Sequence, residues 1–217
     1  MLPFTREQFF AVFVDYNAAV WPAQWFGYAL GLAMLVMLLR PRPDGDRWLG
    51  AGLALMWLWT GVVYHGLFFS AINRAALLFG GLFALQGLLF AHVGLVRREL
   101  QFAVRRDFAG IVGWALMAYA LLLYPLIGMA AGHRLSELPM FGITPCPVTL
   151  FTLGLLLQAR APLARRLLVI PLVWTLIGGS ASFLLGVPQD WLLLASSAVA
   201  VYLLVHDRRG PTHLAAA

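Results

Sequence analysis

Charged residues are scarce in this chain of 217 residues. Asp, Glu, Lys and Arg together make up 11% of it, whereas hydrophobic residues make up 62%. In soluble domains about 25% of residues are charged. The shortage of charge therefore excludes a soluble globular domain and predicts an integral membrane protein, with the lipid bilayer as its partner.

Two residue types on which particular chemistries depend are missing or nearly so. All fifteen basic residues are Arg, so no Lys can form a Schiff base, which excludes a retinal protein. The one cysteine, Cys146, excludes an internal disulfide and a four-thiolate metal site within one chain. The Arg residues lie at the ends of apolar runs and form no stripe with exposed aromatic residues, so nucleic acid is not expected as a partner.

Long apolar runs are abundant by contrast. A helix that crosses a bilayer needs about 20 mostly apolar residues, and the sequence predicts seven such runs whose interiors hold no charged residue. They cover residues 22–39, 48–69, 75–96, 109–131, 143–159, 167–187 and 190–205. The last boundary depends on the polar turn from Gly186 to Asp190; if that turn lay inside the membrane, six spans would remain.

The distribution of arginine predicts an orientation. Twelve of the fifteen lie in the segments that join the first and second, third and fourth, and fifth and sixth runs, or in the C-terminal tail. The other three are Arg6, Arg74 and Arg134. Positive residues stay in the cytoplasm, so we expect a bacterial cytoplasmic (inner) membrane protein with its N-terminus outside and its C-terminus inside. The predicted fold is an all-α, multi-pass transmembrane bundle of seven helices.

The two ends of the chain differ from the bundle at residues 21–206. Thr5 and Gln8 have the spacing of a capping box, and residues 1–20 are predicted to form a short amphipathic helix on the outer membrane surface. The alternative is a frayed extension of the first span. Residues 207–217 are expected to be a disordered cytoplasmic tail.

The segment Gly142-Ile143-Thr144-Pro145-Cys146-Pro147 is the sharpest local feature. Thr144 suits an N-cap and Pro145 a first helical position, so the fifth span is short and follows non-helical chain. Broken helices of this kind often bind substrate in transporters; the alternative is an ordinary helix start with Cys146 as packing. With the other polar groups on the outer side, the candidate substrate-binding residues are His65, Asn73, Gln86, Thr144, Cys146, Asp15 and Asn17.

Cys146 also suggests a soft-metal site. The Pro-Cys-Pro run resembles the transmembrane motif of heavy-metal pumps, although the other domains of those pumps are missing. Thiol, imidazole and thioether ligands suit an ion such as Cu(I). The candidate ligands are Cys146, His133, Met129 and Met140, but they match no fixed metal-binding spacing.

Features spread along the chain carry a resemblance to a family. They include Phe4–Phe9, Tyr16-Asn17, Trp21-Pro22, Tyr64-His65, Phe69, Asn73 and Thr144–Pro147. With these features, the chain resembles an uncharacterised family of bacterial multi-pass membrane proteins. The resemblance implies a membrane location and brings no activity or site residue with it.

The leading functional prediction is a permease or channel-like carrier for a small solute or ion, with an outward-facing polar site beside the broken fifth helix. A non-transporting sensor, assembly factor or redox protein that uses Cys146 is the alternative. A membrane-embedded enzyme ranks third, because the sequence has no H-E-x-x-H motif and no pair of buried carboxylates.

Overall fold

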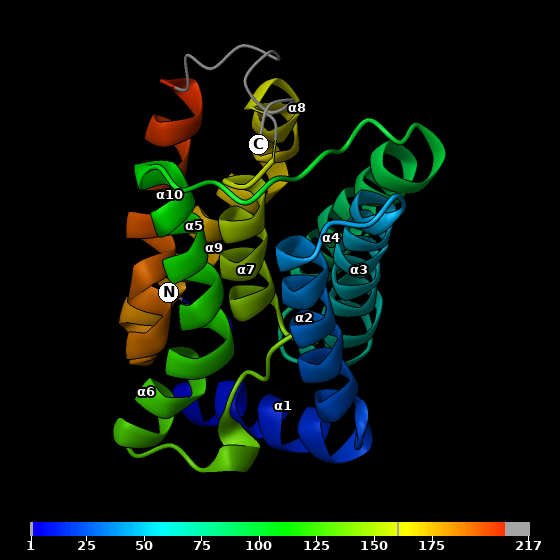
Figure 1. Cartoon of the computed structure of the whole chain (residues 1–217). Coiled ribbons are helices and arrows are strands. Elements are labelled where there is room, and N and C mark those ends of the chain that lie inside the picture. The colour runs from blue at the N-terminus through cyan, green and yellow to red at the C-terminus, as the bar shows by residue number, and fades with distance from the viewer. Residues whose placement is uncertain (1, 160, 207–217) are drawn as a thin grey trace.

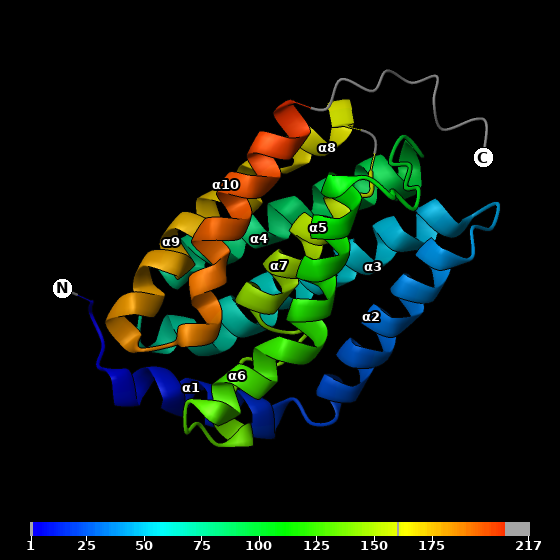
Figure 2. The ribbon, with the colours of Figure 1, turned by 60° about the vertical axis from the view of Figure 1, so that its left-hand side comes forward.

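The computed structural model describes residues 2–159 and 161–206, and in these residues it is built from helices that run between two ends of a bundle (Figure 1). One helix, α1, lies across one end, which we call the α1 end; the opposite end carries α8 and is called the α8 end (Figure 2). The helices are α1 (Arg6–Ala19), α2 (Ala23–Leu39), α3 (Gly45–Trp59) with η1 (Thr60–Phe68) and η2 (Phe69–Ala71), α4 (Ala76–Phe90) with η3 (Ala91–Val96), α5 (Phe108–Ala118), η4 (Tyr119–Leu123), α6 (Tyr124–Ala130), η5 (Leu135–Glu137), α7 (Pro145–Leu156), α8 (Ala161–Leu167), α9 (Val169–Leu185), η6 (Pro188–Asp190) and α10 (Trp191–Val205).

The all-α prediction is confirmed, but the prediction of seven spans is corrected. Within the described residues, three continuous helical stretches are long and apolar enough to cross a membrane: Gly45–Ala71, Ala76–Val96 and Phe108–Ala130. α2, α7, α9 and α10 have 17, 12, 17 and 15 residues, which corresponds to about 18–26 Å at 1.5 Å per residue. They are shorter than the roughly 30 Å of a hydrocarbon core. Counting apolar residues overestimates the spans because it includes the non-helical chain at each end.

The first helix begins where the sequence indicates. The Thr5 hydroxyl accepts a hydrogen bond from the Gln8 N–H, and the Gln8 side chain accepts one from the Thr5 N–H, so the predicted capping box is present. α1 then ends at Ala19, and α2 leaves it at an angle of 85°. α1 is thus a separate helix, and the alternative of a frayed extension of α2 is wrong.

The centre of the bundle is α7. Every residue from Phe141 to Ala159 is buried, which is expected of a short helix that is apolar on all sides. The chain before it is not helical, as the prediction of a broken helix requires. At Gly142, φ is +81°, and a Cβ at Gly27 would meet the Phe141 carbonyl oxygen at 2.6 Å. Two glycines therefore let α2 cross this non-helical chain in direct backbone contact.

The α8 end is closed by residues 97–107 (Figure 1). The buried Gln158 side chain donates to the Gly110 carbonyl and accepts from the Arg105 N–H. The Arg105 guanidinium pairs with Asp107 at 2.7 Å, and Asp107 also caps α5 through the Gly110 N–H. Nine of the described arginines lie on the elements of this end: Arg40, Arg42, Arg47, Arg97, Arg98, Arg105, Arg106, Arg165 and Arg166. The predicted tail, 207–217, and Arg160 lie outside the described residues.

Candidate functional site

A cavity of about 250 Å³ opens at the α1 end, between α1, η1, η2, the start of α7 and the second half of α9. Its wall is mostly apolar. The aromatic lining residues are Phe4, Phe9, Phe13, Tyr64, Phe69, Phe79 and Trp174. α9 contributes Trp174 and three larger aliphatic residues, and between them the small residues Gly178, Ser180, Ala181 and Ser182. Room for a ligand exists here because these small residues of α9 leave space beside the aromatic rings.

The cavity also has a polar part, formed by Asp190 and Cys146, which are 4% and 8% exposed. The Tyr124 hydroxyl donates to Asp190 Oδ1 at 2.5 Å. The Cys146 thiol lies beside Asp190, Tyr124 and Trp174. A buried carboxyl, a thiol and an indole N–H thus meet at one side of an apolar space.

Asp190 owes its position to the turn between α9 and α10. Gly186 ends α9 in the left-handed conformation, with φ of +66°, and Pro188 opens the short η6 helix that ends at Asp190. No Arg or His in the described part of the chain forms an ion pair with the Asp190 carboxylate. Burial raises the pKa of Asp190 to about 7, and the hydrogen bond from Tyr124 opposes that shift. The carboxyl is therefore protonated at moderately acidic pH and can then donate a hydrogen bond.

His65 lies directly behind the aromatic wall. It is fully buried, and its ring centroid is 5.0 Å from that of Trp174 and 6.0 Å from that of Phe79. Both ring nitrogens of His65 and the indole nitrogen of Trp174 have no hydrogen-bond partner among the described residues. Buried polar groups are normally hydrogen-bonded, so this end of the bundle holds unused polar groups next to the cavity.

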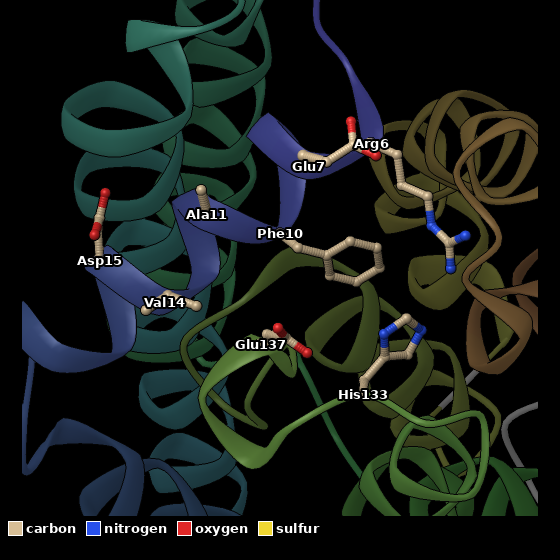
Figure 3. Close-up of a pocket in the computed structure, with 8 residues that line it drawn as sticks. All are labelled: Arg6, Glu7, Phe10, Ala11, Val14, Asp15, His133 and Glu137. Carbon is tan, nitrogen blue, oxygen red and sulfur yellow. The ribbon is translucent and has the colours of Figure 1, made fainter.

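A second hollow, an open cleft of about 500 Å³, lies on the other side of α1 (Figure 3). We call it the α1 cleft. The residues that line it are Arg6, Glu7, Phe10, Ala11, Val14, Asp15, His133 and Glu137. α1 therefore separates two hollows: Phe9 and Phe13 face the apolar cavity, and Arg6 and Phe10 face the charged cleft.

The structure places the predicted binding residues in several environments. Cys146 and Asn73 line the cavity, and His65 lies next to it. Asp15 is exposed and lines the α1 cleft. Asn17 donates to the carbonyls of Ser136 and Leu138, which ties α1 to the chain before α7.

The other two predicted residues have their hydrogen bonds within the fold. Thr144 is the N-cap residue of α7 as predicted, but its hydroxyl donates to the Met140 carbonyl at 2.7 Å and does not cap the helix. Gln86 donates to the Leu167 carbonyl at 3.0 Å, which joins α4 to the end of α8. Both are occupied in holding elements together.

The candidate soft-metal ligands are spread over the α1 end. Cys146 lines the cavity, whereas His133 lines the α1 cleft and stacks on Phe10 with ring centroids 4.4 Å apart. Met129 is exposed, and Met140 packs against the cluster that contains Tyr16 and Tyr64. No group of three or more His, Cys, Asp or Glu residues in the described chain is arranged to hold a metal ion.

Sequence reasoning missed Asp190, Tyr124 and Trp174 as site residues. The sequence places Asp190 in a polar turn on the outer side, but it is not among the predicted site residues; its contact with Cys146 joins residues 44 positions apart. One signal was available, since Asp190 is an acidic residue at the boundary of two apolar runs. Tyr124 and Trp174 gave no such signal, because aromatic residues are common in apolar helices.

Comparison with known proteins places the whole bundle in one family. A model of a family of unknown function (DUF6064) matches residues 6–213. The chain belongs to this family. No curated protein and no solved structure matches it. The match covers the whole α1 cleft and all of the cavity lining except Leu2 and Phe4, so the chemistry of both has to be inferred from the geometry.

Proposed function

We propose that this protein of the DUF6064 family is a membrane-embedded binding protein for a small lipid-soluble molecule that carries one hydrogen-bonding head group. The observation that carries the proposal is the cavity at the α1 end, with its aromatic wall and its buried polar part of Asp190 and Cys146. Ligand sites are commonly apolar with a few polar groups that fix orientation. At about 250 Å³, the space suits one ring or a short chain.

The surface of the bundle supports a lipid environment. Large apolar side chains on several helices are highly exposed, among them Phe26 at 72%, Leu67 at 68% and Leu78 at 66%. A soluble monomer rarely exposes so many. We propose a bacterial cytoplasmic membrane, with the arginine-rich α8 end in the cytoplasm and α1 along the outer surface, because positive residues favour the cytoplasmic side.

The ligand is proposed to reach the cavity from the lipid. Leu184, which is 72% exposed, lines the cavity and also faces outward from α9. An apolar molecule could thus pass along α9 without crossing water. The leading prediction from sequence, a permease or channel-like carrier for a small solute or ion with a polar site, fits this wall less well, since few polar groups face the cavity. Binding is the step that the geometry supports.

Filling the cavity tests the proposal. Ala181→Phe adds a ring from α9, and Leu176→Phe, on a 61% exposed position of the same helix, is the matched control. In detergent-solubilised protein, a brominated medium-chain alcohol is expected to quench tryptophan fluorescence saturably in the parent and the control, and without saturation in Ala181→Phe. Trp174→Phe should remove most of the saturable quenching. Equal, non-saturable quenching in all four proteins would refute the site.

The accessibility of the Cys146 thiol distinguishes this proposal from a thiol-based function. Its side chain is buried beside the Asp190 carboxyl, a setting that does not favour a thiolate. We expect an apolar maleimide to label Cys146 from the membrane, the brominated alcohol to protect it, and a charged thiol reagent to react slowly. Rapid labelling by the charged reagent, with loss of phenotype in Cys146→Ser, would support the redox or soft-metal alternative instead.

A further inference from the structure

The α1 cleft lies outside the proposed lipid-soluble site and carries charges of both signs. Its basic side chains are Arg6 and His133, and its acidic ones are Glu7, Asp15 and Glu137. In the described chain no ion pair joins the basic side chains to the acidic ones. Opposite charges that share a cleft without pairing are positioned to contact a third group.

On the basic side of the cleft, Arg6 and His133 each contact the Phe10 ring. The Arg6 guanidinium lies 5.5 Å from the Phe10 ring centroid, and the His133 ring stacks on Phe10 at 4.4 Å (Figure 3). Phe10 therefore fixes the positions of both basic side chains in the cleft. The His133 Nε2 atom is buried and has no hydrogen-bond partner in the part of the chain that the structure describes. Arginine and imidazole N–H groups suit the oxygen atoms of a phosphate, and the N-terminus of α1 adds a favourable dipole on this side.

The acidic side is farther along α1. Figure 3 shows the Glu137 carboxylate pointing into the cleft and Asp15 at its far end. One Glu137 oxygen accepts the Arg134 N–H at 2.8 Å, and the other accepts no hydrogen bond from the described residues, so it can accept one from a ligand. The pKa of the Glu7 carboxyl is lowered, mainly by its own backbone N–H and the Thr5 hydroxyl and also by the neighbouring Arg6. Glu137 and Asp15 are the other acidic groups of the cleft.

We propose that the α1 cleft binds a zwitterionic phosphoethanolamine group, with the phosphate at Arg6 and His133 and the ammonium group at Glu137. The arrangement discriminates against simpler ions. A lone phosphate would meet the Glu137 and Asp15 carboxylates, and a lone amine would meet Arg6. A ligand with both charges makes two favourable contacts, one at each side of the cleft. Each of its charges is then paired with an opposite charge, which offsets the repulsion from the like charges of the cleft.

The ligand chemistry has two possible sources, a phospholipid head group or free phosphoethanolamine. Full-length protein in detergent is titrated by calorimetry with phosphoethanolamine, lysophosphatidylethanolamine, inorganic phosphate and ethanolamine. We expect the two zwitterions to bind at least tenfold more tightly than phosphate or ethanolamine. Tighter binding of the lysolipid identifies a head-group site, and equal binding of the two identifies a free metabolite; both support the proposal. Equal binding of phosphate and phosphoethanolamine would overturn it.

Variants on each side of the cleft locate the contacts. Arg6→Gln should weaken phosphoethanolamine binding about tenfold. Glu137→Gln should weaken it similarly while strengthening binding of inorganic phosphate, a crossover that loss of folding cannot produce. Arg134→Gln, an exposed position next to the cleft, is the matched control and should change little. Equal losses in Arg134→Gln and Arg6→Gln would refute the site. Ala181→Phe should retain this binding, so failure of the cavity proposal and failure of this one are distinguishable.

Discussion

At the α8 end of the bundle, the side chain of Gln158 has both amide groups hydrogen-bonded, to Gly110 and Arg105. At the α1 end, the buried side chain of Gln189 has neither its Nε2 nor its Oε1 atom bonded within the described chain. The contrast extends to carboxylates. Asp107 at the α8 end pairs with Arg105 and caps a helix, whereas Asp190 at the α1 end is buried without an ion-pair partner among the described residues.

The two ends differ in how many of their buried polar groups are hydrogen-bonded within the fold. Buried polar groups that are fully satisfied stabilise a fold, and unsatisfied ones cost free energy. Along with Gln189, the unpartnered groups of the α1 end include His65, Trp174 and His133. Proteins keep such costs mainly where they bind ligands. The contrast therefore supports the proposal of binding sites at the α1 end, where these unsatisfied groups lie.

The largest expected effect concerns the two aspartates. Because the folded pKa of Asp190 is about 7, above its ordinary 3.8, its neutral form is favoured in the fold. The resulting stability is present below about pH 4 and is lost as the pH rises through about 7, in total on the order of 4 kcal/mol. We expect the thermal midpoint of the protein in detergent to fall between pH 5 and pH 8.

Two variants test whether Asp190 causes this pH dependence of the thermal midpoint. Asp190→Asn, which keeps an acceptor for Tyr124, should flatten the pH profile over this range and raise the midpoint at pH 8. Asp107→Asn breaks the ion pair with Arg105 and should lower the midpoint equally at pH 5 and pH 8. If both variants left the same slope as the parent, Asp190 would not be the group that titrates.

The next effect compares the two glutamines. Gln158→Leu leaves the Arg105 N–H and the Gly110 carbonyl without partners and should destabilise the protein by about 2–4 kcal/mol. Gln189→Leu removes only unpartnered groups and should change stability by less than about 1 kcal/mol, in either direction. For a chain of this size, 1 kcal/mol shifts the midpoint by about 2–4 °C. A larger loss in Gln189→Leu than in Gln158→Leu would reverse the assignment of the two ends.

Local signals predicted the local features. The Thr5–Gln8 capping box, the helix start at Thr144-Pro145 and the break from Gly186 to Asp190 are all present, because each depends on a few neighbouring residues. Contacts between distant segments could not be predicted in this way. Helix length was overestimated because hydrophobicity does not distinguish a helical residue from a buried, non-helical one, as Leu157 to Ala159 illustrate: they belong to the predicted run 143–159 but follow the end of α7.

The candidate site was predicted only in part for the same reason. Cys146 and Asn73 were predicted from polarity, and both line the cavity. Gln86 and Thr144 have similar polarity, yet backbone carbonyls occupy their donors. Polarity identifies groups that need a partner, but a single sequence does not show which groups find one inside the fold. The aromatic wall was missed because its residues come from five separate elements.

The smallest expected effect concerns how α1 is attached between the cavity and the cleft. The buried Tyr16 hydroxyl accepts from the Trp59 indole N–H at 2.8 Å and donates to the Ile143 carbonyl at 2.6 Å. Tyr16→Phe leaves both partners unsatisfied, which should cost about 1–2 kcal/mol. The loss should be local: hydrogen exchange should accelerate for amides of α1 (Arg6–Ala19) and stay unchanged in α7, since only α1 is released. Because Phe9 and Phe13 of α1 line the cavity, affinity for the brominated alcohol should fall several-fold.

Tyr202→Phe, at a 61% exposed position on α10, is the control and should alter neither measurement. Unchanged exchange in α1 with weakened binding would mean that Tyr16 acts on the cavity directly, not through the position of α1.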